Sequence, residues 1–551
     1  MPNPPFPDAG EQAPLVWHIQ QFFGINTQAQ RPAIDDNEFS WLQNYMPIGA
    51  GNMRTLASNG ANFYTAPGGK TIVYYYPFNI AGVQQIAIFL SDGTAVQVNP
   101  NTSATVTISA NTGDFYSGTY PPAAAQWNAA GIIIVTEATN PNGYFAWDGT
   151  TLYRPGQNAP NWLTDITPTV MPSGIHGNAI ETYQNRAWVT TPNESGGIPS
   201  IISQSAPGNG ADFDTDDGGG STPQQDSSLR FTFTALRQTN GFLYYWGDSS
   251  VGVISNPQTS GGITTYNNTN VDPQKGTIWP GTVRQFNTSL GPGIMFANPQ
   301  GVFLLVGGVV QKVSGDLDGI FANGDFNTVT PSGGTAIVYG ISVYAVLLKT
   351  LDYKGNALTI MCMTDGRTNA RGDGFRWWSA TQDATLTQIA SGELDSLMTI
   401  YGTDSTHLFQ CFSTPSLTLP KIYQTKFFPG KGPAEYIIFK KMYRLYYIVK
   451  DNSGSGAAFS GTIDGASSST AITPSASGLG QLIFVNNSNQ VINFVNNSAV
   501  IIIFSLSNIL IFGANATGYD LLLGLTLSST NSDFSIIAIT MLYANDAPLA
   551  G

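Results

Sequence analysis

Charge is scarce in this sequence. Its 551 residues include 22 Lys and Arg and 35 Asp and Glu, so only 10% are charged, against about 25% in an ordinary soluble domain. The net charge is −13, whereas proteins dedicated to duplex DNA concentrate cations against the phosphates. The negative net charge argues against a protein that binds nucleic acid over its whole surface. An aromatic content of 12% argues against a disordered chain.

Residues that carry catalytic or metal chemistry are also few. Two cysteines, Cys362 and Cys411, cannot form a disulfide framework or a multi-cysteine metal site. The three histidines lie far apart, and neither an H-E-x-x-H pattern, a G-x-S-x-G nucleophile motif nor a phosphate-binding loop is present. We therefore predict no enzyme activity and no cofactor.

Long hydrophobic runs and an export signal are missing as well. The first residues, MPNPPFPDAGEQ, contain neither a basic nor an apolar region, so no secretory signal is predicted. The stretch 499–514 is apolar but short, rich in isoleucine and interrupted by serine and asparagine. Because a membrane helix needs about 20 apolar residues, this stretch is expected to form strands.

Helical periodicity is almost absent, with brief possible turns of helix at 38–45 and 383–391. Elsewhere, short runs of β-branched and aromatic residues alternate with Gly, Asn, Asp and Pro, as in 71–78, 86–98 and 131–138. This pattern is typical of strands joined by turns. The sequence therefore predicts an all-β protein.

Hairpin-like segments recur along the chain at intervals of 48 to 56 residues. Their turn positions are Gly93, Gly149, Gly197, Asp248, Gly301, Gly355 and Asp404. A period near 50 is typical of the blades of a β-propeller, which bury their faces by stacking around an axis, whereas independent sandwich modules would recur every 90–100 residues. We predict a propeller over 58–415, with six blades favoured and seven possible.

The composition changes after the repeats. Seven of the 22 cations lie in 421–450, and residues 451–551 contain no Lys or Arg. The motif FVNNS occurs twice within 484–498, which suggests adjacent strands with equivalent turns. We predict a separate β domain over 416–551, of sandwich type, in addition to an N-terminal segment 1–57 and the propeller.

Three local patterns are candidate sites. Asp212, Asp214 and Asp216 alternate as carboxylates do in calcium loops, but Gly at position 6 and Glu at position 12 of such a loop are missing, so a solvated loop is favoured. The tripeptide 371–373 reads Arg-Gly-Asp, which we interpret as coincidence. The stretch 421–450 interleaves its cations with aromatic residues, which suits either nucleic-acid stacking or, as we favour, contact with an acidic neighbour through Lys421, Lys426, Lys431, Lys440, Lys441 and Arg444.

Two segments resemble a known family. Residues 24–56 are similar to the opening of the tail nozzle proteins of short-tailed bacteriophages, also called tail tubular protein B-like proteins, and the matching positions are Glu38, Leu42, Asn44, Pro47, Gly49 and Arg54. Residues 177–214 resemble a blade of the same family at Asn185, Arg186, Trp188, Ser205, Gly208, Asp212 and Phe213. Segments 241–255 and 296–321 also look like blades of these proteins, whereas the cation-free C-terminal part matches nothing in the family.

The resemblance implies a structural virion protein, assembled in the host cytoplasm, that forms a homohexameric ring at the distal end of the tail. Its partners would be itself, a tail adaptor or tail-tube ring and double-stranded DNA in transit, with tail fibres or the host cell surface as further candidates. Glu38, Leu42, Asn44 and Arg54 would make partner contacts. The alternative is a carbohydrate- or receptor-binding propeller, such as a tailspike-like adhesin or hydrolase, which Trp377 and Trp378 would suit if their rings were exposed. A secreted host enzyme is a third reading, and the missing export signal disfavours it.

Overall fold

The computed structural model describes residues 15–548 apart from short stretches. Those stretches are 50, 117, 119, 138–142, 165–168, 193–199, 224–231, 429–437, 453–458, 466–468, 473–474, 482–483, 486–490, 493, 496–500, 503–504, 521–522 and 530–532. Strands dominate, and α1 (Asp318–Ala322) is the one α-helix of the described residues. The all-β prediction is confirmed. The possible helical turn at 38–45 is wrong, because β3 (Glu38–Gln43) and β4 (Tyr45–Ile48) are strands.

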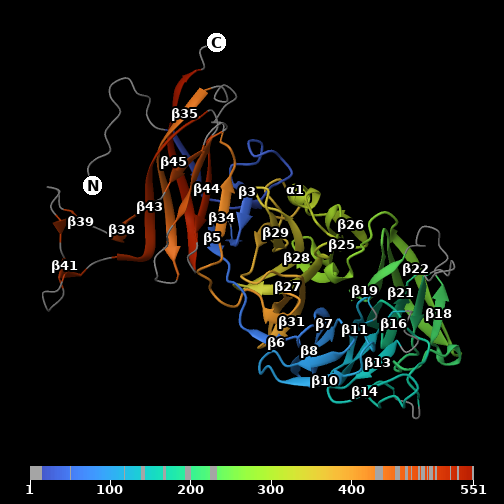
Figure 1. Cartoon of the computed structure of the whole chain (residues 1–551). Helices are drawn as coiled ribbons and strands as arrows, with labels where there is room; N and C mark the ends of the chain where they lie inside the picture. Colours follow the sequence, from blue (N-terminus) through green and yellow to red (C-terminus); the bar gives the residue numbers. More distant parts are fainter. Residues whose placement is uncertain are drawn as a thin grey trace.

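Seven antiparallel four-stranded blades form the propeller in the described part of the chain (Figure 1); six are separate sheets, and one is part of a ten-stranded sheet. Blade 1 is β7 (Ile72–Ile80), β8 (Val83–Leu90), β9 (Ala95–Val98) and β10 (Thr105–Ser109), and blade 2 is β11 (Ala123–Asn128), β12 (Gly131–Val135), β13 (Tyr144–Trp147) and β14 (Leu152–Tyr153). Blade 3 is β15 (Ala179–Tyr183), β16 (Arg186–Thr191), β17 (Ile201–Gln204) and β18 (Gly220–Pro223). Blade 4 is β19 (Phe233–Thr239), β20 (Phe242–Gly247), β21 (Val251–Ser260) and β22 (Ile263–Asp272).

The other three blades complete the circle. Blade 5 is β23 (Arg284–Thr288), β24 (Gly291–Asn298), β25 (Gly301–Val306) and β26 (Val309–Lys312). Blade 6 is β27 (Ser332–Val338), β28 (Ile341–Leu351), β29 (Ala357–Thr364) and β30 (Trp378–Ala380). Blade 7 is β31 (Gln388–Leu394), β32 (Leu397–Thr403), β33 (His407–Gln410) and β6 (Asn62–Thr65).

The blade number corrects the preference for six. Blade 7 takes three strands from the end of the repeat region and its outermost strand, β6, from the beginning, where His407 pairs with Thr65. This pairing joins the two ends of the ring. Neighbouring first strands then pack around one axis, with β27 beside β31 and β31 beside β7.

Large aromatic side chains fill the spaces between blades. Phe89, Phe115, Phe145 and Trp147 form one such cluster between blades 1 and 2, and Trp188 occupies the space between blades 3 and 4. The middle strands are buried on both faces, as in the run GIIIV of β12, which explains why their sequences are continuously apolar rather than alternating.

The second body is a β-sandwich built from both ends of the chain (Figure 1). One sheet contains β1 (Leu15–Ile19), β4, β5 (Asn52–Thr55), β35 (Ile438–Asp451), β38 (Ser475–Gln481), β43 (Ser505–Asp520) and β45 (Phe534–Pro548). The other contains β3 with β2 (Gly24–Ile25), β34 (Lys421–Thr425), β36 (Ser460–Gly465), β37 (Ser469–Ile472) and β44 (Leu523–Ser529). Tyr45 of the first sheet meets Tyr423 of the second edge to face.

Residues 15–55 therefore share both sheets with the C-terminal region instead of forming a separate segment. β3 pairs with β34 on one side and meets β30 of blade 6 on the other, at Gln43 and Ser379. Blade 6 thus continues as one sheet into the sandwich. The chain joins its two bodies by hydrogen-bonded strands rather than by a linker.

The apolar stretch 499–514 is strand where it is described, in β42 (Ile501–Ile502) and β43. The FVNNS repeat gives two hairpins, in which β39 (Phe484–Val485) pairs with β40 (Val491–Ile492) and β41 (Phe494–Val495) pairs with β42. No helix among the described residues is long and apolar enough to cross a membrane.

Candidate functional site

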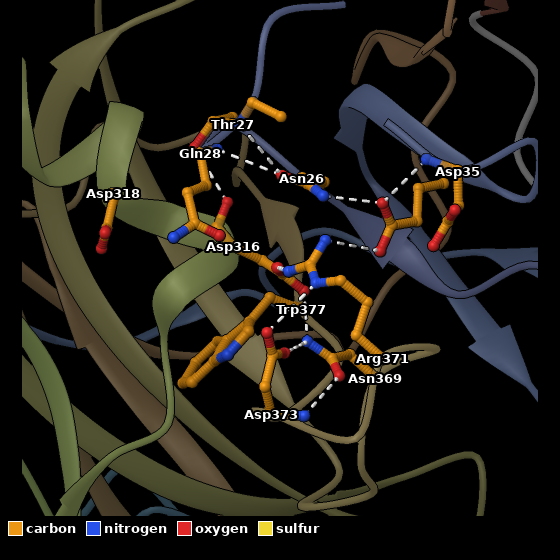
Figure 2. Close-up of polar contacts among 12 residues, drawn as sticks. Asn26, Thr27, Gln28, Asp35, Asp316, Asp318, Asn369, Arg371, Asp373 and Trp377 are labelled. Carbon is orange, nitrogen blue, oxygen red and sulfur yellow. Dashed lines mark hydrogen bonds and ion pairs between the residues drawn. The ribbon is translucent and has the colours of Figure 1, made fainter. Parts of the chain in front are cut away.

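The family-like N-terminal motif lies at the joint between propeller and sandwich. Glu38, at the start of β3, is 2% exposed and accepts a hydrogen bond from Asn26 Nδ2 at 2.7 Å. Its other oxygen lies 3.5 Å from Arg371 Nη1, and Arg371 also pairs with buried Asp316 (Figure 2). Arg371 belongs to the connection between β29 and β30, so one guanidinium holds carboxylates of both bodies.

Burial sets the electrostatics of this cluster. It raises the pKa of Asp316 to about 6, against hydrogen bonding by Asn369 and attraction by Arg371, and the nearby Glu38 adds to the rise. The pKa of Arg371 is raised, because the charges of Asp316 and Glu38 outweigh its own burial. Asp373 also contacts Arg371, at 3.2 Å from Nε. The Arg-Gly-Asp tripeptide therefore has an internal structural function.

A close backbone contact fixes the same joint. Ile25 N donates to Trp377 O at 2.7 Å, and Thr27 N donates to Asp316 O at 2.7 Å. Gly24 has φ +102°, and a Cβ there would lie 2.2 Å from Trp377 O. Only glycine fits a position that combines a left-handed conformation with such an approach.

Leu42 and Asn44 bind the outer strand of blade 6. Leu42 is fully buried, and its carbonyl accepts from Ser379 Oγ at 2.8 Å. Asn44 has φ 61°, and its side chain accepts from Thr381 N at 2.7 Å while donating to Pro420 O at 2.7 Å. Asparagine tolerates the left-handed region and supplies both a donor and an acceptor, which explains its use here.

Arginines complete the joint at both ends of the motif. Arg376 is 4% exposed, pairs with Asp365 and donates to Gly49 O at 2.8 Å and to Pro47 O at 3.5 Å. Arg54 binds Asp533 with two hydrogen bonds, of 3.2 and 2.8 Å, and stacks over the ring of Tyr339. The four N-terminal residues predicted to contact a partner thus all make contacts within the chain.

The basic stretch 421–450 also makes its contacts within the chain where the structure describes them. Lys421 is fully buried and donates to Ser416 O at 2.6 Å, and burial lowers its pKa to about 8. Lys426 pairs with Asp36 at 2.7 Å, so the acidic neighbour of this lysine is the N-terminal part of the same chain. Lys440, Lys441 and Arg444 are strand positions of β35, and Lys431 lies outside the described residues.

The second family-like motif builds a hairpin of blade 3. Arg186 is 3% exposed and donates to Ser205 O and Gly218 O, both at 2.9 Å. Ser205 Oγ accepts from Ala187 N, and Gly208 N donates to Asn185 O. Trp188 is fully buried, and Phe213 packs edge to face on Tyr144. These residues serve the fold.

The candidate calcium loop uses its carboxylates on its own backbone. Asp212 accepts from Asp214 N at 2.8 Å, and Asp214 accepts from Asp216 N at 3.1 Å, which caps the 3₁₀ turn η1 (Thr215–Asp217). Across the described ranges, no three His, Cys, Asp or Glu side chains are placed to hold a metal ion.

Trp377 and Trp378 are completely buried, and Trp377 Nε1 donates to Val313 O at 3.0 Å. The two indole rings are therefore not exposed, and this position does not offer the stacking surface that a sugar-binding propeller would need. Cys362 is buried in β29, and this burial raises the pKa of its thiol above the ordinary value.

Several exposed apolar residues of the propeller gather at one set of turns. We call the turn between the first and second strands of a blade its first turn. All seven first turns have two residues. They lie on the same face of the propeller, because the first strands of all blades run in the same direction along the axis. Among their fourteen residues only Asp395 is charged. Apolar side chains stand exposed beside them at Val83, Phe242, Leu290 and Leu397, with Phe242 at 42% and Leu397 at 60%.

Sequence reasoning missed Arg376, Asp365 and Asp316. Arg376 precedes the buried pair Trp377–Trp378, and an arginine within an apolar run signals a buried partner. Asp316 gives no such signal, because its partner Arg371 is 55 positions away.

The chain matches no family model and no curated protein. Among solved structures it is similar to BBS1N in complex with ARL6DN and to YCF48 bound to D1 peptide, each at 10% identity and TM-score 0.36, over 65% of this chain and 98% of the other. It is also similar to the SapL1 lectin in complex with alpha methyl fucoside, at 11% identity and TM-score 0.27, over 64% of this chain and 98% of that one. The fold assignment, an all-β protein with a seven-bladed propeller and a second β domain, rests on the strand pairing described above.

Proposed function

We propose that this protein is a structural subunit of a virion, which forms the distal nozzle ring of a short phage tail through which the genome leaves. The observation that carries the proposal is the location of the motif 38–54. Every matching residue with a described contact lies at the joint of propeller and sandwich, so the likeness to the nozzle family concerns the residues that fix the subunit's shape.

The joint suits a subunit under mechanical load. A sheet that runs from blade 6 into the sandwich, together with buried arginine–carboxylate pairs at Arg371 and Arg376, leaves no flexible linker between the bodies. Breaking a buried ion pair costs about 3–5 kcal/mol. A ring that transmits force between a tail and a cell needs such rigidity.

We place the contact between copies on the first turns of the blades other than blade 6, because the first turn of blade 6 meets the sandwich through Tyr339. Identical copies with a net charge of −13 repel one another, so association is least opposed where charge is least. The first turns offer such a surface and add exposed apolar side chains, which mark interaction sites. Head-to-tail association, in which these turns of one copy meet a different surface of the next, gives a closed ring when the rotation between copies closes. The low cation content also suits a conduit, because phosphate contacts would retain passing DNA.

The mass of the purified full-length protein tests the proposal. A hexamer of the 58.7 kDa chain would weigh about 350 kDa, either in solution or after addition to tails that lack their distal ring. Mass photometry over a range of concentrations measures this directly. A chain that stays monomeric at every concentration and never joins such tails would refute the proposal.

A further inference from the structure

A groove of about 320 Å³ opens where the blade 6 turn 352–356 faces the outer surface of the sandwich. Its floor is the exposed side of β34, β44 and β36, and one wall is the turn that carries Tyr353 and Lys354. The opposite side of these strands is apolar, with Tyr423, Leu525 and Ile463 buried in the core. The groove therefore lies between blade 6 and the outer surface of the second body, apart from the buried ion pairs of the joint and from the first turns.

The floor is a ladder of polar side chains. Gln424 pairs in register with Thr526, and Thr526 pairs with Thr462, so the three side chains stand in one row on one face. Ser528 occupies the next row along β44. Adjacent strands lie about 4.8 Å apart, which sets the spacing of these hydroxyl and amide groups.

A fixed carboxylate and guanidinium stand at the end of this ladder. Asp464 accepts hydrogen bonds from Arg31 Nη2 at 2.7 Å and from the hydroxyls of Thr526 and Thr462. Arg31 also donates to Thr425 O at 2.7 Å and stacks over Phe427. Gly524 makes room for it, because a Cβ there would lie 2.6 Å from Arg31 Nη2. The pair is thus held in place before any ligand arrives, which lowers the cost of binding.

The wall is equally well fixed. The Asp352 carboxylate accepts from Lys354 N and Asn356 N, both at 2.8 Å, and so braces the turn. The ring of Tyr353 is half-buried beside Trp41. An aromatic ring beside a row of hydroxyl, amide and carboxylate groups offers stacking on one side and hydrogen bonds on the other.

We propose that this groove binds a neutral saccharide. Sugar hydroxyls both donate and accept, which matches a floor where acceptor and donor, Asp464 and Arg31, stand side by side. A phosphate or sulfate would find Arg31 and Lys354 in the groove but would also meet the Asp464 carboxylate, with which Arg31 is already paired. An extended peptide would find the backbone of these strands already paired. An apolar ligand would remove water from the ladder, whose groups bond to one another and to Asp464, without replacing the hydrogen bonds to that water. The proposal does not depend on ring formation.

Titration of the full-length protein with defined ligands tests the proposal. The probes are neutral tri- and tetrasaccharides of glucose, galactose, mannose and N-acetylglucosamine, with an oligogalacturonate and inorganic phosphate as anionic counterparts, followed by saturation-transfer NMR and calorimetry. We expect saturable binding of at least one neutral oligosaccharide. Tyr353→Ala and Thr526→Val should each weaken it by about three- to tenfold, as expected for one lost contact.

Matched controls distinguish binding in the groove from binding elsewhere on the surface. Thr265→Val on β22 removes a threonine from an exposed polar ladder outside the groove, and Tyr120→Ala removes an exposed tyrosine elsewhere; neither should change the affinity. The proposal is overturned if no neutral saccharide binds, if only the anions bind, or if the groove variants bind as the controls do while unfolding at the same temperature.

Discussion

Two sets of turns on opposite faces of the propeller, the first turns and the turns between second and third strands, differ in how they are made and in what they expose. First turns are uniform two-residue hairpins, and five of the seven place both residues at positive φ, as at Asn240–Gly241, which is the type I′ geometry that matches strand twist. On the opposite face, the turns between second and third strands carry aspartates: Asp92, Asp248, Asp352 and Asp404.

The difference shows two ways of stabilising a turn. A type I′ turn needs only residues that tolerate positive φ, so the side chains beside it can be apolar. The aspartate turns use a carboxylate to accept backbone N–H groups, as Asp404 does from Thr406 N at 2.9 Å and His407 N at 2.6 Å, and they therefore carry charge. The first turns themselves are thus low in charge and suited to association, whereas the turns between second and third strands carry charge that suits solvent.

The strongest test places charge on the apolar face. Phe242→Glu combined with Leu397→Glu adds two like charges where copies would meet, and we expect the concentration for half-assembly to rise tenfold or more, measured by mass photometry. Leu351→Glu alters an exposed residue, 41% accessible, next to an aspartate turn on the other face and should leave assembly unchanged. Equal effects of the two changes would remove the distinction between the faces.

A smaller effect, on the free energy of unfolding, is expected when an aspartate is removed from a turn between second and third strands. Asp92→Ala removes a carboxylate that accepts from Thr94 N and Thr94 Oγ1 and pairs with Lys70, which should lower the free energy of unfolding by about 1 kcal/mol at pH 7 without affecting assembly. Urea unfolding measures the loss, and Asn101→Ala, in an exposed turn of the same blade, serves as a comparison.

The pH dependence of that loss has a defined sign. Burial would raise the pKa of Asp92, but its hydrogen bonds with Lys70 and Thr94 prevail and lower it to about 2. A carboxyl with a depressed pKa stabilises the fold above its unfolded value near 4 and loses this contribution as the pH falls toward 2. The difference between wild type and Asp92→Ala should therefore shrink between pH 5 and pH 2, and a constant difference would contradict this role.

The smallest expected effect sharpens the type I′ account. Asp395 and Ser396 have φ 48° and 63°, so replacing them by Asn and Gly should stabilise the protein by about 0.5–1 kcal/mol. The same pair at Ala129–Ala130, a first turn without positive φ, should give no gain. Thermal melts of both variants decide between turn geometry and a general effect of glycine.

The sequence predicted the repeat better than the blade count. The six turn markers that the structure describes lie in six different blades in chain order, and Gly197 lies outside the described residues. The marker at Asp404 belongs to a blade with three local strands, and its fourth, β6, lies more than 300 residues earlier. No local pattern announces such a pairing, so six and seven blades could not be separated.

The joint shows a second limit. The motif around Glu38 and Asn44 was recognised as a set of contact residues, but a contact motif does not say which surface it meets. Lys426 illustrates this, since an acidic neighbour was expected and Asp36 of the same chain supplies it. The Arg-Gly-Asp tripeptide gives no sign of the partners of Arg371, because only the fold brings it to Asp316 and Glu38.

Negative-stain electron microscopy of the purified full-length protein tests the central claim most directly. The account predicts closed rings with a central opening, in which the first-turn faces meet neighbouring copies and which disappear in the Phe242→Glu, Leu397→Glu variant. Single two-lobed particles at every concentration, both alone and with tails that lack their distal ring, would contradict it.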